Sequence, residues 1–174
     1  NFKTLLFSVV KDLNDGAHTE INKLNLINSS DKVRLLNDWN NTQKWLPDVK
    51  YVHQLFERWA QRTPDALALT FRDTSVSYQK LNEQANKLAH YLRQIGVWPE
   101  VVTAICVERS VEMIVAVLAV LKSGGCYLPV DPTIPSKRIK YILNNANCHN
   151  VITNSSVLAI HNILNEFDLV SMDC

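Results

Sequence analysis

Glycine is rare in this sequence of 174 residues, which contains only Gly16, Gly96, Gly124 and Gly125. The phosphate-binding loops of nucleotide enzymes, of the Walker and GxGxxG types, need glycines at fixed offsets because backbone N–H groups must approach the phosphate closely. Neither pattern can be written with these four glycines. If the chain belongs to a nucleotide enzyme, we therefore expect its phosphate loop to lie outside these residues.

Clusters of charge and of metal ligands are also missing. The formal net charge is +1 and the basic residues are scattered, which disfavours a nucleic-acid partner. The four cysteines form no CxxC pair and the five histidines have no ligand-like spacing, so we predict no metal site. Widely spaced cysteines suit reduced thiols, and no secretory signal is visible, so we predict a cytoplasmic protein.

The longest apolar run, Met113 to Leu121, is short for a membrane helix. Its nine residues would make ~14 Å of helix at ~1.5 Å per residue, against ~30 Å of hydrocarbon core. We therefore predict no membrane partner and a helix that is buried in protein. Lys122 to Gly125 closes the run and Cys126 to Val130 follows, which predicts a glycine-capped core helix leading into a strand.

Strand-like and helical segments alternate around this stretch. Strands are predicted at 101–107, 126–130, 151–153 and 168–172. Helices are predicted at 52–62, 81–95, 111–122, 135–143 and 155–164, and a hairpin at 66–78. Alternating strands and helices predict an α/β fold with a parallel sheet that carries helices on both faces.

Residues 1–45 differ from the rest because no hydrophobic period is sustained there. Ser29 or Ser30 is predicted to cap a short helix carrying Val33 and Trp39. The residues that follow favour turns. This part is either an N-terminal arm or a linker inherited from a preceding domain.

Three stretches resemble parts of nonribosomal peptide synthetases. Leu121 to Pro132 (LKSGGCYLPVDP) resembles the second core motif of their adenylation domains, commonly LKAGGAYLPVDP. Val76 to Leu81 (VSYQKL) is similar to the first core motif, L-T/S-Y-x-E-L, although Lys80 stands where the motif has Glu. The segment ending in DWNNT, residues 38–42, resembles the linker after a condensation domain. The chain is therefore identified as the N-terminal portion of such an adenylation domain, residues 46–174, preceded by a condensation-domain tail and linker, residues 1–45.

The resemblance implies part of the N-terminal subdomain of the adenylate-forming fold and, in the parent enzyme, a two-step ligase. That enzyme would use ATP and Mg²⁺ to turn an amino acid into an aminoacyl adenylate, and then pass it to the phosphopantetheine thiol of a carrier domain. The family's phosphate loop and catalytic lysine would come after residue 174. We therefore assign no catalytic, cofactor-binding or metal-binding residue here, and expect the isolated chain to be inactive. Its partners would be the upstream condensation domain, the rest of the adenylation domain and the carrier domain.

Two other interpretations stay open. An acyl-CoA synthetase or luciferase-like enzyme would have the same fold, and a non-enzymatic α/β binding module would explain the missing phosphate loop. Asp131 could be an acid near a site, but an Asp beside Pro more often caps a turn. His53, near the start of a helix, fits a surface or capping role better than a catalytic one.

Overall fold

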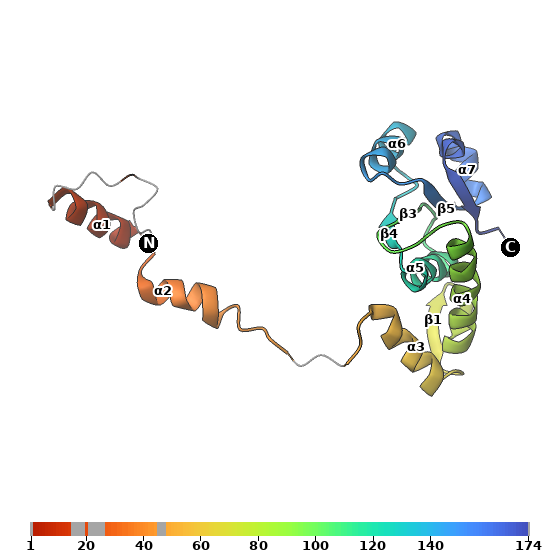
Figure 1. Cartoon of the computed structure of the whole chain (residues 1–174), viewed down its shortest axis with the longest axis horizontal. Coiled ribbons are helices and arrows are strands. Elements are labelled where there is room, and N and C mark those ends of the chain that lie inside the picture. Colours follow the sequence, from red (N-terminus) through yellow and green to blue (C-terminus); the bar gives the residue numbers. More distant parts are fainter. Residues whose placement is uncertain (1, 15–19, 21–26, 45–47, 174) are drawn as a thin grey trace. The chain divides into compact units, whose positions relative to one another are not determined.

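The computed structural model describes residues 2–14, 20, 27–44 and 48–173. They belong to two compact units, Asn1–Pro47 and Asp48–Cys174. Figure 1 draws both units, with the first in red and orange. The second unit contains every element of the α/β fold.

The first unit is helical in its described part. Helix α1 spans Phe2–Asn14, and α2 (Ser29–Val33) continues into a π-helical turn, η2 (Arg34–Asp38). Asn28, and not Ser29 or Ser30 as predicted, caps α2, because its side-chain oxygen accepts the Asp31 N–H at 2.7 Å. The prediction was one residue late because Asn caps as well as Ser and precedes both serines. The predicted helix exists, and the assignment of residues 1–45 to a condensation-domain tail stays a prediction.

The second unit opens with a helix, a hairpin and a second helix. They are α3 (Val52–Arg62), β1 (Leu67–Phe71), β2 (Thr74–Ser77) and α4 (Tyr78–Gln94). The strands pair antiparallel with Phe71 opposite Thr74, so the turn is only Arg72 and Asp73. Arg72 has φ 51°, the left-handed conformation that such a tight turn requires. The predicted hairpin is present with a shorter connection than expected.

Four parallel strands form the main sheet. They are β3 (Val102–Ile105), β4 (Cys126–Pro129), β5 (Asn150–Thr153) and β6 (Asp168–Ser171), in the order β4-β3-β5-β6. Both neighbours of β3 run parallel to it, and Thr103, Ala104 and Ile105 are buried. An apolar segment broken only by Thr103 is typical of a strand covered on both faces.

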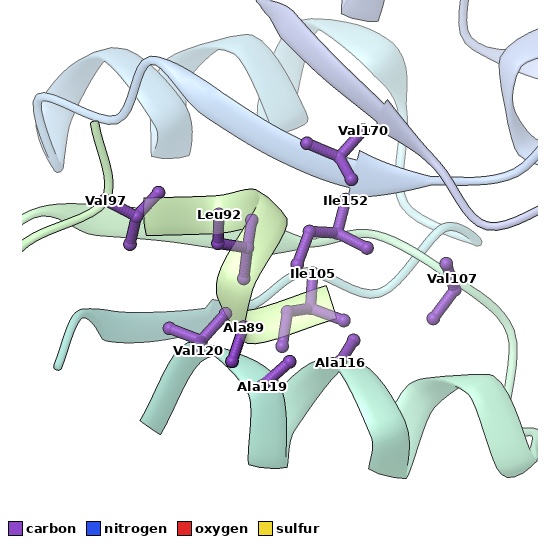
Figure 2. Close-up of a cluster of buried hydrophobic side chains, with 10 residues drawn as sticks. All are labelled: Ala89, Leu92, Val97, Ile105, Val107, Ala116, Ala119, Val120, Ile152 and Val170. Carbon is purple, nitrogen blue, oxygen red and sulfur yellow. The ribbon is translucent and has the colours of Figure 1, made fainter. Parts of the chain in front are cut away.

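Helices cover both faces of this sheet, as predicted. They include α5 (Val111–Ser123), α6 (Ser136–Asn145) and α7 (Ser155–Ile160), and a 3-10 turn, η3 (Asn162–Glu166), follows α7. Figure 1 shows α6 and α7 on one side of the strands and α4 and α5 on the other. Successive strand residues face opposite sides: Ile105 and Ile152 pack with α4 and α5, while Ala104 and Val151 pack with α6 and α7 (Figure 2 draws the first cluster). The α/β architecture is therefore confirmed.

Each glycine of the α5–β4 turn has its own structural reason. Gly124 ends α5 in a left-handed conformation, φ 97°, which glycine adopts without steric cost. Gly125 is buried, and a Cβ there would lie 2.7 Å from Val97 Cγ1 and 3.1 Å from the Val101 carbonyl oxygen. The turn therefore needs glycine first for its backbone angle and then for its close packing.

Candidate functional site

The strand order places a topological switch point between β3 and β5. The helix after β3 is α5, on one face, and the helix after β5 is α7, on the other. In open α/β sheets, ligands bind beyond the carboxyl ends of the strands at such a point. The loops after β3, β4, β5 and β6 meet at this edge, and two hollows open there.

The first hollow is polar and has a volume of about 360 Å³. Its walls come from the hairpin turn and from the loops after β3, β5 and β6: Phe71, Arg72, Glu108, Arg109, Ser110, Glu112, Asn154, Met172 and Asp173. Two of its polar groups serve the fold. Asn154 caps α7 by accepting the Val157 N–H at 3.1 Å, and Asp173 accepts the Ser155 N–H at 2.7 Å. Hydrogen bonds from the Ser155 and Ser171 hydroxyls hold the pKa of Asp173 below its usual value. This hollow therefore combines two exposed arginines, Arg72 and Arg109, with an asparagine and an aspartate that stabilise the fold.

The second hollow, of about 490 Å³, lies between the ends of β3 and β4 and includes Asp131. The Asp131 carboxylate accepts the N–H and the hydroxyl of Thr133, both at 2.8 Å. The N–H bond and then the hydroxyl bond lower the pKa of Asp131. Asp131 is therefore a turn-forming aspartate, the more frequent fate weighed for it from the sequence.

Cys106 lies directly beyond β3 and is fully buried in the cluster that includes α6 and α7. Burial, and then the negative charge of Asp131, raise the pKa of its thiol to about 11. Only the thiolate is a strong nucleophile. Cys106 therefore packs as a small apolar side chain.

A buried histidine, His161, fixes the loop after β4, and no pattern along the chain predicted this role. His161 Nε2 lies 2.6 Å from the Pro132 carbonyl oxygen, and its Nδ1 lies 2.8 Å from the Ser136 hydroxyl. A carbonyl only accepts, so Nε2 carries a proton and donates to Pro132. This clamp joins the end of α7 to the start of α6.

Lys122 is the most deeply buried cation of the described chain, with 5% of its side chain exposed. Its ammonium lies 2.5 Å from Glu57 Oε1 and 2.8 Å from each of Asn82 Oδ1 and Asn86 Oδ1. The Phe56 ring lies 5.9 Å from the same nitrogen. All three ammonium protons are thus satisfied, and helices α3, α4 and α5 are joined at one atom. From sequence, Lys122 was only the polar end of an apolar run.

His53 stands near this junction, in the first turn of α3. Its ring stacks on Tyr51 at 5.6 Å between centroids and is half-buried. Burial lowers its pKa, although Glu57 opposes this by raising it. The contact of His53 with Tyr51 lies at the start of α3, where a capping or surface histidine was expected.

The residues present do not fit ATP or Mg²⁺. Across residues 2–14, 20, 27–44 and 48–173, no group of three or more His, Cys, Asp or Glu side chains could hold a metal ion. Gly124 and Gly125 donate their N–H groups to the carbonyls of Leu121 and Val120, at 3.2 and 3.1 Å, so neither N–H can cradle a phosphate. The assignment of no catalytic, cofactor or metal residue stays a prediction. In the same part of the chain, no helix is both long and apolar enough to cross a bilayer.

Comparison with known proteins defines the class. The family model described as AMP-binding enzyme matches residues 56–172. Chondramide synthase cmdD of Chondromyces crocatus is 46% identical over 156 residues, 88% of this chain but 4% of that protein. The chain belongs to the AMP-binding enzyme family.

Solved structures narrow this class. The nonribosomal peptide synthetase FmoA3, bound to α-methyl-L-serine-AMP, matches 99% of this chain with a TM-score of 0.77 and 26% identity, over 20% of its own length. The N-terminal subdomain of Klebsiella oxytoca NpsA matches 71% of this chain with a TM-score of 0.62 and 28% identity, over 32% of its own length. The predicted recognition, the N-terminal part of a nonribosomal peptide synthetase adenylation domain, is thereby confirmed. The chain spans a small fraction of each of these proteins.

Proposed function

We propose that this chain is the scaffold segment of an amino-acid-activating adenylation domain. In the parent reaction, an amino acid carboxylate attacks the α-phosphate of ATP, pyrophosphate leaves, and an aminoacyl adenylate forms. The phosphopantetheine thiol of a carrier domain then displaces AMP and takes the aminoacyl group as a thioester. Such chemistry needs Mg²⁺ and positive groups around the phosphates.

The main observation behind the proposal is how Gly124 and Gly125, in the second core motif, are hydrogen-bonded and packed. Its two N–H groups are bonded within the fold, and Gly125 is enclosed by Val97 and the Val101 carbonyl. The motif that most resembles the synthetases thus serves to pack α5 against β4. The groups that contact ATP would be supplied by the remainder of the domain, so the isolated chain is proposed to be inactive.

The domain assignment and the partners belong to the same proposal. Residues 1–45 would be the tail of a condensation domain with its linker, and residues 46–174 the N-terminal portion of the adenylation domain. Cys106, Cys126 and Cys148 are free thiols, which suits the reducing cytosol in which we place the parent enzyme.

Exchange of labelled pyrophosphate into ATP, across a panel of amino acids, tests this function. The chain alone should give no exchange. A chimera in which residues 48–174 replace the matching part of the adenylation domain of chondramide synthase should exchange with at least one amino acid. Exchange by the chain alone would refute the scaffold role. A well-folded chimera that is inert with every amino acid would point to the binding module instead.

A further inference from the structure

Helix α3 buries little of its surface against the rest of the second unit. Ala60 is the only residue of α3 that is buried, whereas Val52, Leu55 and Trp59 are exposed. Phe56 is half-buried and packs with residues of β2, α4 and α5. Because buried apolar area is the main source of stability between packed elements, the apolar contribution to the docking of α3 is small.

A single hydrogen bond joins α3 to the core. In the described part of the second unit, the bond from Lys122 to Glu57 is the only hydrogen bond between α3 and any segment outside residues 48–63. The other side-chain hydrogen bonds of α3 stay within those residues. The docking of α3 therefore depends on this ion pair to an unusual degree.

The partners of the Lys122 ammonium differ between its two sides. On α4, Asn82 and Asn86 each present a neutral amide oxygen at 2.8 Å. On α3, Glu57 presents a carboxylate at 2.5 Å. The neutral acceptors thus belong to the core, and the anion belongs to the helix that is weakly attached.

The Lys122 side stays in place when α3 moves away. Arg93 of α4 donates to the carbonyls of Lys122 and Ser123, at 2.6 and 3.4 Å, so the end of α5 is held without α3. The Glu57 side chain is 37% exposed, so water reaches this position as soon as α3 leaves. The ammonium then keeps two amide acceptors and gains a water for its third proton. Undocking of α3 therefore leaves no buried charge without partners.

We propose that Lys122 and Glu57 form a latch, through which α3 docks on and undocks from an otherwise intact α/β core. Helix α3 is the first helix of the second unit, so the chain that arrives from residues 1–47 enters the core through it. With the latch open, α3 moves while Lys122 stays bonded to α4. The sheet and the α5–β4 turn are thereby insulated from movements of the preceding segment. This inference does not depend on the proposed function.

Native-state hydrogen exchange of the 174-residue chain tests the latch without any substitution. The amides of α3 are compared with those of β3 and β5 at increasing urea concentrations. We expect the α3 amides to exchange through an opening that has a smaller free energy and a weaker dependence on urea, because it exposes less surface than global unfolding does. Equal free energies and equal urea dependence for α3 and the two strands would overturn the proposal.

Two variants test whether the ion pair is the latch. Glu57→Gln removes the anion and should speed exchange in α3 by about a hundredfold. Adding Asn82→Asp returns an anion to Lys122 from the α4 side, so exchange in β3 and β5 should return to its original rate while α3 stays fast. Glu166→Gln, in the exposed pair of Lys140 and Glu166 at 2.6 Å, is the control and should alter neither. Unchanged exchange of α3 in the first variant, or its recovery together with the strands in the double variant, would overturn the proposal.

Discussion

Replacing Gly125 with alanine tests the packing of the second core motif most sharply. The new Cβ would lie 2.7 Å from Val97 Cγ1, 3.1 Å from the Val101 carbonyl oxygen and 3.4 Å from Val120 Cγ1. Since Val97 and Val120 are both fully buried, their side chains have little room to move. Overpacking of this kind costs about 1–3 kcal/mol, and the backbone contact places Gly125→Ala in the upper half of that range.

Two other glycines separate packing from backbone strain. Gly96 has φ 92° but nothing within 4 Å of an added Cβ, so Gly96→Ala should cost only the left-handed conformation, about 1–2 kcal/mol. Gly124→Ala adds ordinary contacts with Pro99, at 3.5 Å, to a similar strain. Gly125→Ala has no such strain, since its φ is not in the left-handed range. Its cost is therefore steric.

A double-mutant cycle makes this distinction measurable. Val97→Ala alone should cost about 2 kcal/mol through lost burial and a cavity. Combined with Gly125→Ala, it removes the 2.7 Å clash, so the pair should be less destabilising than the sum by about 1 kcal/mol. The same cycle with Gly124→Ala should be additive. Urea unfolding followed by circular dichroism gives each free energy. A coupling near zero for Val97 and Gly125 would refute the steric argument.

Four other predictions concern buried thiols and charged side chains. Glu57→Gln should lower the unfolding free energy by about 3 kcal/mol, because the buried Lys122 ammonium loses its anion; an unchanged urea midpoint would contradict this. Cys126 is exposed and should react with a thiol reagent in the native protein, whereas Cys106 should react only after unfolding. Because burial keeps Cys106 protonated from pH 9.0 to about 11, the unfolding free energy should fall across that window, and less so in Cys106→Ala. Asp173 has a pKa held below 3.8, so its stabilisation is present above that pH and lost as pH falls further; a pH titration of Asp173→Asn should show a shallower loss.

Most helices and strands of the second unit could be predicted from the sequence, because the local hydrophobic pattern agrees there with the burial that the structure shows. The apolar segment 101–107 is buried on both faces, and the run ending at Gly124 becomes the capped helix α5. The ends of β3 differ from the prediction by one and two residues, because hydrogen bonding and not composition sets strand ends. The strand order β4-β3-β5-β6 could not be predicted from the sequence, because strand pairing depends on contacts between distant segments.

The polar interior was much harder to foresee. Lys122 finds its partners 36 to 65 residues away, and His161 reaches Pro132 across 29 residues. No spacing along the chain encodes such pairs, because they exist only after three helices or two loops have met. Asp131 was foreseen because its partner Thr133 is two residues away. Polar contacts between residues close in the sequence can thus be predicted from it, whereas those between distant residues cannot.

The central position of β3 has a consequence for synthesis on the ribosome. Both strands that flank it, β4 and β5, are translated after it. At ~5–20 residues per second, the apolar segment ending at Ile105 waits on the order of a few seconds before β4 is complete. Of the two helices that pack on this face, α4 is made before that delay and α5 is made during it. A nascent chain paused between these two strands would therefore be a natural substrate for chaperones.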